Sequence, residues 1–136
     1  MADLISWGPN FITGVNLIDT DHKKLVDMLN GLAKAMTDGK GKSALAPLLN
    51  NLVDYTVKHF GNEERLMVQY HYVDAPAHLD EHKKLVADVL AFKADLDSGK
   101  AVISIAILHF LREWLSNHIM KTDMKFGKSL IEAGYR

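Results

Sequence analysis

Two pairs of potential metal ligands stand near the middle of the chain at the same spacing. His59 and Glu63 form the first pair, His78 and His82 form the second, and the members of each pair are four residues apart. On an α-helix this spacing places two side chains on one face, about one turn apart. Because imidazole nitrogens and carboxylate oxygens bind transition metals, each pair is a candidate part of a metal site. The sequence has no cysteine, which excludes thiolate ligands and disulfides.

The segment that separates the two pairs predicts a break between two helices. Asp74, Ala75 and Pro76 form a pattern typical of a helix start, because proline is favoured in the first turn. Two helices joined by a short loop are antiparallel neighbours. The end of the first helix and the start of the second then lie side by side, so the side chains of both pairs can converge.

The rest of the chain predicts two more helices and no sheet. Apolar residues recur at helical spacing in four segments, and stretches with glycine or proline separate these segments. Asp19 or Thr20 is the expected N-cap of the first helix. No segment shows the sustained period-two alternation of a strand. The expected helices cover residues 19–38, 43–70, 74–97 and 101–118, with helical character continuing to residue 134.

These patterns predict an all-α protein with a single domain over residues 1–136, a length that suits one core. Residues 1–18 contain Gly8, Pro9 and Gly14 and predict an N-terminal arm. Residues 19–136 are expected to form an antiparallel up-down-up-down four-helix bundle.

In this topology one end of the bundle collects potential ligands from every helix. The start of the first helix, the end of the second, the start of the third and the end of the fourth all lie at that end. Seven histidines scattered at random would rarely meet this condition. The candidate metal ligands are His22, His59, Glu63, His78, His82, His118 and Asp123.

The composition of this ligand set indicates two metal ions. Five imidazoles and two carboxylates are too many for one tetrahedral zinc, and they suit two six-coordinate ions such as iron. If both carboxylates bridge, five nitrogens, four carboxylate oxygens and one bridging oxygen shared by both ions fill about eleven of about twelve positions. One position then remains for a small ligand.

The spacing of His118 and Asp123 makes a separate structural prediction. They are five residues apart, about 140° around a regular helix, so straight α-helix cannot direct both inward. We expect a helix end, a kink or a local widening between them. His109 precedes His118 by nine residues and should face away, and His71 falls in the predicted loop. Both are expected to be bystanders.

The ligand pattern resembles that of the hemerythrin family, and specifically its bacterial hemerythrin-like domains. The resemblance covers essentially the whole chain, and within the family the chain is similar to domains attached to chemotaxis receptors. The motifs that carry it are His22, His59-x-x-x-Glu63, His78-x-x-x-His82 and His118-x-x-x-x-Asp123. Further matching residues are Trp7, Ile18-Asp19, Glu63-Glu64, Leu66-Met67, Tyr70, Trp114 and His118-Ile119.

The resemblance implies a non-haem di-iron site that binds O₂ reversibly. Two iron ions, as Fe²⁺ or Fe³⁺, would share a bridging oxo or hydroxo group, and Glu63 and Asp123 would also bridge them. The implied ligands of the first iron are His78, His82 and His118. The implied ligands of the second iron, which has the open position, are His22 and His59. The implied apolar O₂ pocket consists of Phe60, Trp114, Leu115 and Ile119.

The resemblance also implies a role in oxygen sensing, storage or delivery (transport) rather than an enzyme activity. O₂ is the expected partner, and sensing would require a signalling domain in a longer parent protein. The net charge of −1 indicates neither nucleic acid nor an anionic membrane as a partner. The longest apolar run, residues 101–111, is too short to span a bilayer. The N-terminus lacks the pattern of a signal peptide, so we expect a cytoplasmic protein.

Two other classes of metalloprotein compete with this interpretation. His78, Glu81 and His82 fit the H-x-x-E-H pattern of a zinc hydrolase, in which Glu81 would be the general base. That alternative leaves the convergence of all four helix ends without a purpose. A ferritin-like carboxylate di-iron protein expects Glu-x-x-His pairs on two helices, and this sequence has none.

Several acidic residues near the candidate ligands could orient imidazoles through hydrogen bonds. Surface charge is the simpler interpretation for most of them. These residues are Asp19, Asp21, Glu64, Asp80 and Glu81.

Overall fold

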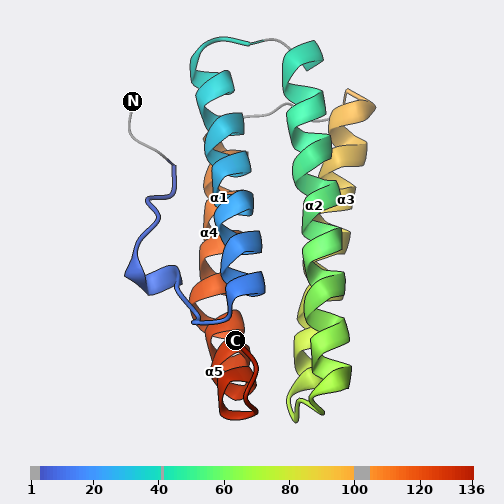
Figure 1. The fold of residues 1–136 in the computed structure, drawn as a ribbon. Coiled ribbons are helices and arrows are strands. Elements are labelled where there is room, and N and C mark those ends of the chain that lie inside the picture. Colours follow the sequence, from blue (N-terminus) through green and yellow to red (C-terminus); the bar gives the residue numbers. More distant parts are fainter. Residues whose placement is uncertain (1–3, 41, 100–104) are drawn as a thin grey trace.

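The computed structural model describes residues 4–40, 42–99 and 105–136, and within these ranges it contains helices and loops but no strand (Figure 1). The predicted all-α class is therefore confirmed. The expected start of the fourth helix near residue 101 lies outside the described residues. The elements in chain order are η1 (Pro9–Phe11), α1 (Asn16–Thr37), α2 (Lys42–Gln69), α3 (Ala75–Asp97), α4 (Ile105–Asn117), η2 (His118–Asp123) and α5 (Met124–Glu132).

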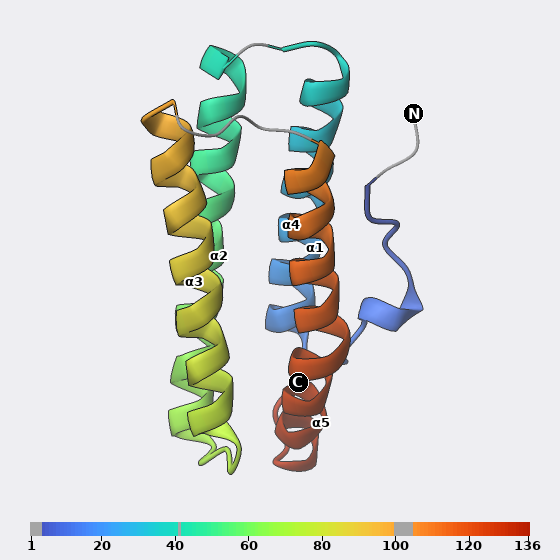
Figure 2. The ribbon, with the colours of Figure 1, turned by 180° about the vertical axis from the view of Figure 1, so that it is seen from behind.

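The long helices form an antiparallel four-helix bundle, in which α4, η2 and α5 together make the fourth member (Figures 1 and 2). Helix α1 packs against α2 and α4, and α2 packs against α3. The N-terminal arm runs along the outside of the α1–α4 side of the bundle (Figure 2). No helix of the described residues is long and apolar enough to cross a membrane.

Helix α1 begins at Asn16, within the residues assigned to the arm, so the expected start at Asp19 or Thr20 was wrong. Asp19 has a different role from the predicted N-cap. Its carboxylate accepts hydrogen bonds from the Thr13 amide (2.8 Å), the Thr13 hydroxyl (2.7 Å) and the Gly14 amide (3.1 Å). Gly14 has a φ of +90°, a conformation that favours glycine. Asp19 thus fixes the turn that leads into the helix.

Two separate apolar clusters fill the bundle. The large apolar cluster occupies most of its length, and the small apolar cluster occupies the end that holds the α2–α3 loop and α5. The large apolar cluster consists of Ile5, Phe11, Leu25, Val26, Leu29, Leu32, Ala33, Leu45, Leu49, Leu52, Val53, Val89, Leu96, Leu108, Leu111, Leu115 and Ile119. The small apolar cluster consists of Val15, Ile18, Leu66, Met67, Tyr72, Phe126 and Leu130.

Candidate metal centre

A buried polar layer separates the two apolar clusters. In α1, for example, His22 lies between Ile18 of the small cluster and Leu25 of the large one. The structure brings all seven side chains singled out from the sequence into this layer, and each is at most 3% exposed. The members of this metal layer are His22, His59, Glu63, His78, His82, His118 and Asp123.

The metal layer divides into two groups of potential ligand atoms that share both carboxylates. Within each group, the ligand atoms all lie within 4.8 Å of one another. This arrangement can hold two neighbouring metal ions, with the shared carboxylates between them. The first group contains Glu63, His78, His82, His118 and Asp123. The second group contains His22, His59, Glu63 and Asp123.

Each shared carboxylate directs one oxygen to each group. Glu63 Oε1 lies 3.1 Å from His82 Nε2, whereas Glu63 Oε2 lies 3.6 Å from His59 Nε2. Asp123 Oδ1 lies 3.0 Å from His78 Nε2, whereas Asp123 Oδ2 lies 3.8 Å from His59 Nε2. A carboxylate with one oxygen on each side is oriented to bridge two ions.

Buried polar atoms without a hydrogen-bond partner gather in the metal layer. Both oxygens of Glu63 and Oδ1 of Asp123 lack a partner among the described residues. The same is true of Nε2 of His59, His78, His82 and His118. A buried polar group left unsatisfied costs about 1–3 kcal/mol, so such atoms are rare unless something binds them. These residues therefore fit a pair of metal ions.

The protonation states of the layer follow from its opposite charges. Burial alone would lower the pKa of the His59 imidazole, but the charges of Glu63 and Asp123 raise it to about 10. Burial would likewise lower the pKa of His78, but Asp123 and Glu63 raise it to about 9. Burial also opposes ionisation of the two carboxylates, yet the nearby imidazoles hold the pKa of both below the usual range. Metal binding must therefore displace protons from imidazoles but not from carboxylates.

Three imidazoles each form a hydrogen bond through Nδ1 with a carboxylate on the outer side of the layer. This contact fixes the proton on Nδ1 and leaves Nε2 free to bind a metal. For these three acids the surface-charge interpretation was wrong, although Asp19 holds a turn and Asp80 is exposed. The pairs are His59 with Asp21 (2.9 Å), His82 with Glu64 (3.0 Å) and His118 with Glu81 (2.8 Å).

Further side chains hold these carboxylates, and the sequence analysis missed them. Tyr55 donates its hydroxyl to Asp21 (2.9 Å) and Asn62 donates its amide to the same carboxylate (3.1 Å). Positions 55, 59 and 62 share one helical face, so the spacing could have indicated both residues. Thr122 donates to Glu81 at 2.9 Å, and no sequence signal indicated that contact.

Residues His118–Asp123 form a π-helix, η2, so the local widening is the one of the three predicted alternatives that occurs. A π-helix has a wider turn with i→i+5 hydrogen bonds, so residues five apart fall on one face. Both side chains consequently enter the metal layer, where His118 Nε2 lies 3.2 Å from Asp123 Oδ1. Such π-segments are frequently found at functional sites.

Apolar and aromatic side chains cover the side of the layer that faces the large apolar cluster. The ring of Phe60 stacks on His82 with centroids 3.8 Å apart, and it lies 5.2 Å from the His118 ring. Leu115 and Ile119 are buried in the large cluster itself. All of these side chains exclude water from the layer.

The remaining candidates lie apart from the layer or are already engaged. His71 and His109 are exposed and belong to neither ligand group. Glu81, the general base of the zinc-hydrolase alternative, instead accepts hydrogen bonds from His118 and Thr122. His78 and His82 belong to a five-residue group rather than to a two-histidine site.

The chain matches known proteins over nearly its whole length. Residues 13–130 match the hemerythrin HHE cation binding domain. A bacteriohemerythrin of Methylococcus capsulatus is 36% identical over 128 residues, which are 93% of this chain and 97% of that protein. A hemerythrin-like protein of Naegleria gruberi is 34% identical over 121 residues, which are 89% of each chain.

Solved structures agree with this assignment. A crystal structure of wild-type hemerythrin superimposes with a TM-score of 0.85 at 36% identity, covering 93% of this chain and 98% of that one. The ligand groups of the metal layer match the di-iron centre expected for such a fold. The zinc-hydrolase alternative is not favoured, and the chain belongs to the hemerythrin family, whose members bind O₂ at a di-iron centre.

Proposed function

We propose that the metal layer holds two iron ions and binds O₂ reversibly between them and the large apolar cluster. The division of the layer into two groups that share Glu63 and Asp123 carries this proposal. These two carboxylates would bridge the ions. The ligands of the first iron would be His78, His82 and His118. The ligands of the second iron would be His22 and His59.

The iron pair, when bound, supplies an open coordination position and the two electrons needed to hold O₂ reversibly. The chain's own residues position and protect that chemistry. Asp21, Glu64 and Glu81 orient three imidazoles through Nδ1. The apolar pocket would keep water away, because water and protons promote irreversible oxidation. Its residues would be Phe60, Trp114, Leu115 and Ile119.

We infer a binding protein rather than an enzyme, working in the cytoplasm. The acids around the layer are committed to imidazoles, so they are not free to serve as a general base. Storage or delivery of O₂ would need this site alone. Sensing would need in addition a signalling partner that responds to the bound state.

The decisive experiment measures iron content and the visible spectrum of the reduced protein before and after O₂ is admitted. We expect two irons per chain, with bands that appear with O₂ and fade when it is removed. One zinc per chain and no bands would contradict the proposal and favour the zinc-hydrolase alternative.

A matched pair of variants tests the shared carboxylates. Asp123→Asn keeps the shape of the side chain but removes its charge, so we expect fewer than two irons per chain. Asp54→Asn makes the same change at an exposed position of α2 and should retain both irons. Two irons in both variants would exclude the proposed role of Asp123.

A further inference from the structure

The three carboxylates that accept hydrogen bonds from Nδ1 of the layer's imidazoles differ in how far water reaches them. The side chain of Asp21 is 7% exposed, whereas those of Glu64 and Glu81 are 40% and 37% exposed. Water can therefore offset much of the charge of Glu64 and Glu81, but little of the charge of Asp21. The charge of Asp21 thus acts strongly on its imidazole, His59, unless the chain itself offsets that charge.

The chain supplies two further hydrogen-bond donors to Asp21. Besides Nδ1 of His59, its carboxylate accepts hydrogen bonds from the Tyr55 hydroxyl at 2.9 Å and from the Asn62 side-chain amide at 3.1 Å. Tyr55 binds one carboxylate oxygen, while His59 and Asn62 bind the other. Three donors therefore share the charge of this buried carboxylate.

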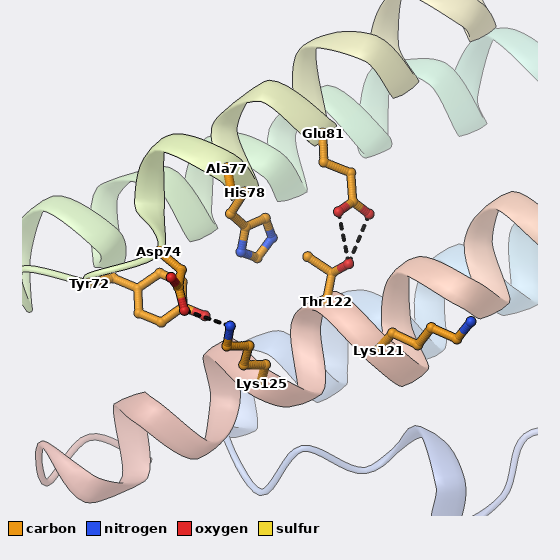
Figure 3. A pocket seen from close by; sticks show the side chains of 8 residues that line it. All are labelled: Tyr72, Asp74, Ala77, His78, Glu81, Lys121, Thr122 and Lys125. Atoms are coloured by element: carbon orange, nitrogen blue, oxygen red, sulfur yellow. Dashed lines mark hydrogen bonds and ion pairs between the residues drawn. The ribbon is translucent and has the colours of Figure 1, made fainter.

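The two more exposed carboxylates have fewer donors. Thr122 donates its hydroxyl to Glu81 at the wall of a surface pocket and lies 2.9 Å from each carboxylate oxygen (Figure 3). Glu64 accepts a hydrogen bond only from His82 within the described residues. The most buried of the three carboxylates therefore has the most donors, which indicates that side chains replace water at Asp21.

The surroundings of Tyr55 suit a hydrogen-bond donor. The ammonium groups of Lys24 and Lys58 lie 4.7 Å and 5.8 Å from the centre of its ring. Positive charges over an aromatic ring hold the ring in place, and they make its hydroxyl a stronger donor. Burial and the charge of Asp21 raise the pKa of Tyr55 to about 12, so the hydroxyl keeps its proton at ordinary pH.

These donors affect how strongly Asp21 acts on His59. A carboxylate that accepts a hydrogen bond from a metal-binding imidazole raises the basicity of the ligand nitrogen, and a more basic ligand favours ferric over ferrous iron. Donors that share the charge of the carboxylate reduce this effect. His22, the other imidazole of the second ligand group, has no partner at Nδ1 among the described residues. In the described part of the chain, Asp21 is therefore the outer carboxylate through which the second iron can be tuned.

We propose that Tyr55 and Asn62 are positioning residues that raise the reduction potential of the second iron by sharing the charge of Asp21. They act on the iron only through Asp21 and His59. A higher potential favours the ferrous state, which is the state that binds O₂. This inference rests on the proposed function, and it adds that two residues outside the ligand set determine how readily the O₂-binding iron is oxidised.

The test is a spectroelectrochemical titration of the iron-loaded protein without O₂. Tyr55→Phe removes only the hydroxyl, so Asp21 should act more strongly on His59. We expect the ferrous-to-ferric ratio at a fixed potential to fall about threefold, which corresponds to about 30 mV for a one-electron step. Asn62→Ala should shift the potential in the same direction. The N–H proton resonance of His59 should move downfield in both variants, because its hydrogen bond to Asp21 becomes stronger.

Matched controls make the same changes away from Asp21. Tyr72→Phe also removes a hydroxyl close to the layer, since the Tyr72 ring lies 6.3 Å from the His78 ring, but this hydroxyl is not bound to a carboxylate of the described residues. Asn51→Ala removes an amide at an exposed position of α2. Both controls should keep the potential of the unmodified protein.

Several outcomes would overturn the inference. An unchanged potential in Tyr55→Phe and Asn62→Ala with two irons bound would do so, as would an equal shift in Tyr72→Phe. A rise in potential would show that Tyr55 serves to orient Asp21 rather than to share its charge. Fewer than two irons in the unmodified protein would contradict the proposed function itself, so the two failures are distinguishable.

Discussion

The large apolar cluster and the metal layer are built from the same four helices, but burial has opposite effects in the two. In the cluster, side chains such as Leu25, Leu29 and Leu32 gain about 25 cal/mol for each Å² removed from water. In the layer, Glu63 and Asp123 are fully buried as charged groups, which is unfavourable unless they are paired or bind a metal. From this contrast we infer that the large apolar cluster supplies the stability that keeps the metal layer folded before its ions bind.

Removing the iron should have the largest effect on stability, because the buried charges of the metal layer then lose the ions that they bind. A ligand present at about 1,000 times its dissociation constant stabilises the folded state by about 4 kcal/mol, and that contribution is lost with the metal. Urea unfolding of the loaded protein and of the chelator-treated protein measures the difference. Equal midpoints for the two forms would show that iron binding adds no stability to the folded chain.

Creating a cavity in the large apolar cluster should lower stability and leave the metal layer intact. Leu29 is 1% exposed, so Leu29→Ala should lower the free energy of unfolding by about 3 kcal/mol. Iron content should remain at the unmodified value, because Leu29 belongs to the large apolar cluster and lies about two helical turns from His22 on α1. Loss of iron together with stability would mean that the two regions are not separable.

Raising the pH should destabilise the iron-free protein through the layer alone. The folded-state pKa of His59 is raised to about 10 and that of His78 to about 9. Their contribution is complete below the unfolded pKa of about 6.5 and is lost as the pH rises through 9 to 10. The effect should be smaller than iron removal, since the imidazoles share the same two carboxylates. Urea midpoints at pH 6, 8 and 10 test this, and the loaded protein should lack the decline.

The smallest expected effect is a gain in stability from a substitution in the loop beside the small apolar cluster. His71 follows α2 with a φ of +53°, a left-handed conformation that disfavours side chains with a Cβ atom. His71→Gly should raise the free energy of unfolding by about 1 kcal/mol without changing iron content. His71→Ala removes the imidazole but keeps the strain, so it should give no gain. A similar gain in both variants would assign the effect to the imidazole instead.

The convergence of the ligands in the metal layer could be predicted from the sequence, because it depends only on the spacing of residues along each helix and on the direction of the helices. Helical spacing places His59 with Glu63 and His78 with His82, and antiparallel topology brings the four helix ends together. The five-residue gap before Asp123 required a wider turn, and η2 supplies it.

The outer contacts of the layer depend on how each helix is rotated and on the reach of each side chain. Asp19 and Asp21 are two residues apart, yet one holds a turn and the other binds His59. Glu81 and Asp80 are adjacent, and only Glu81 reaches an imidazole. Residue type and spacing do not distinguish such neighbours, whereas the packing of the helices does.

The π-helix η2 determines the orientation of residues in both the metal layer and the small apolar cluster, because α5 continues directly from it. Within a continuous helix, adding or deleting one residue rotates everything beyond it by about 100°. Forming a regular α-helix from the same six residues of η2 would place Asp123 about 140° around the helix from His118 and turn it out of the layer. It would also turn Phe126 and Leu130, which follow on α5, away from the small cluster. The π-helix therefore sets the rotation of α5 about its axis. With this rotation, Asp123 lies in the metal layer while Phe126 and Leu130 lie in the small apolar cluster.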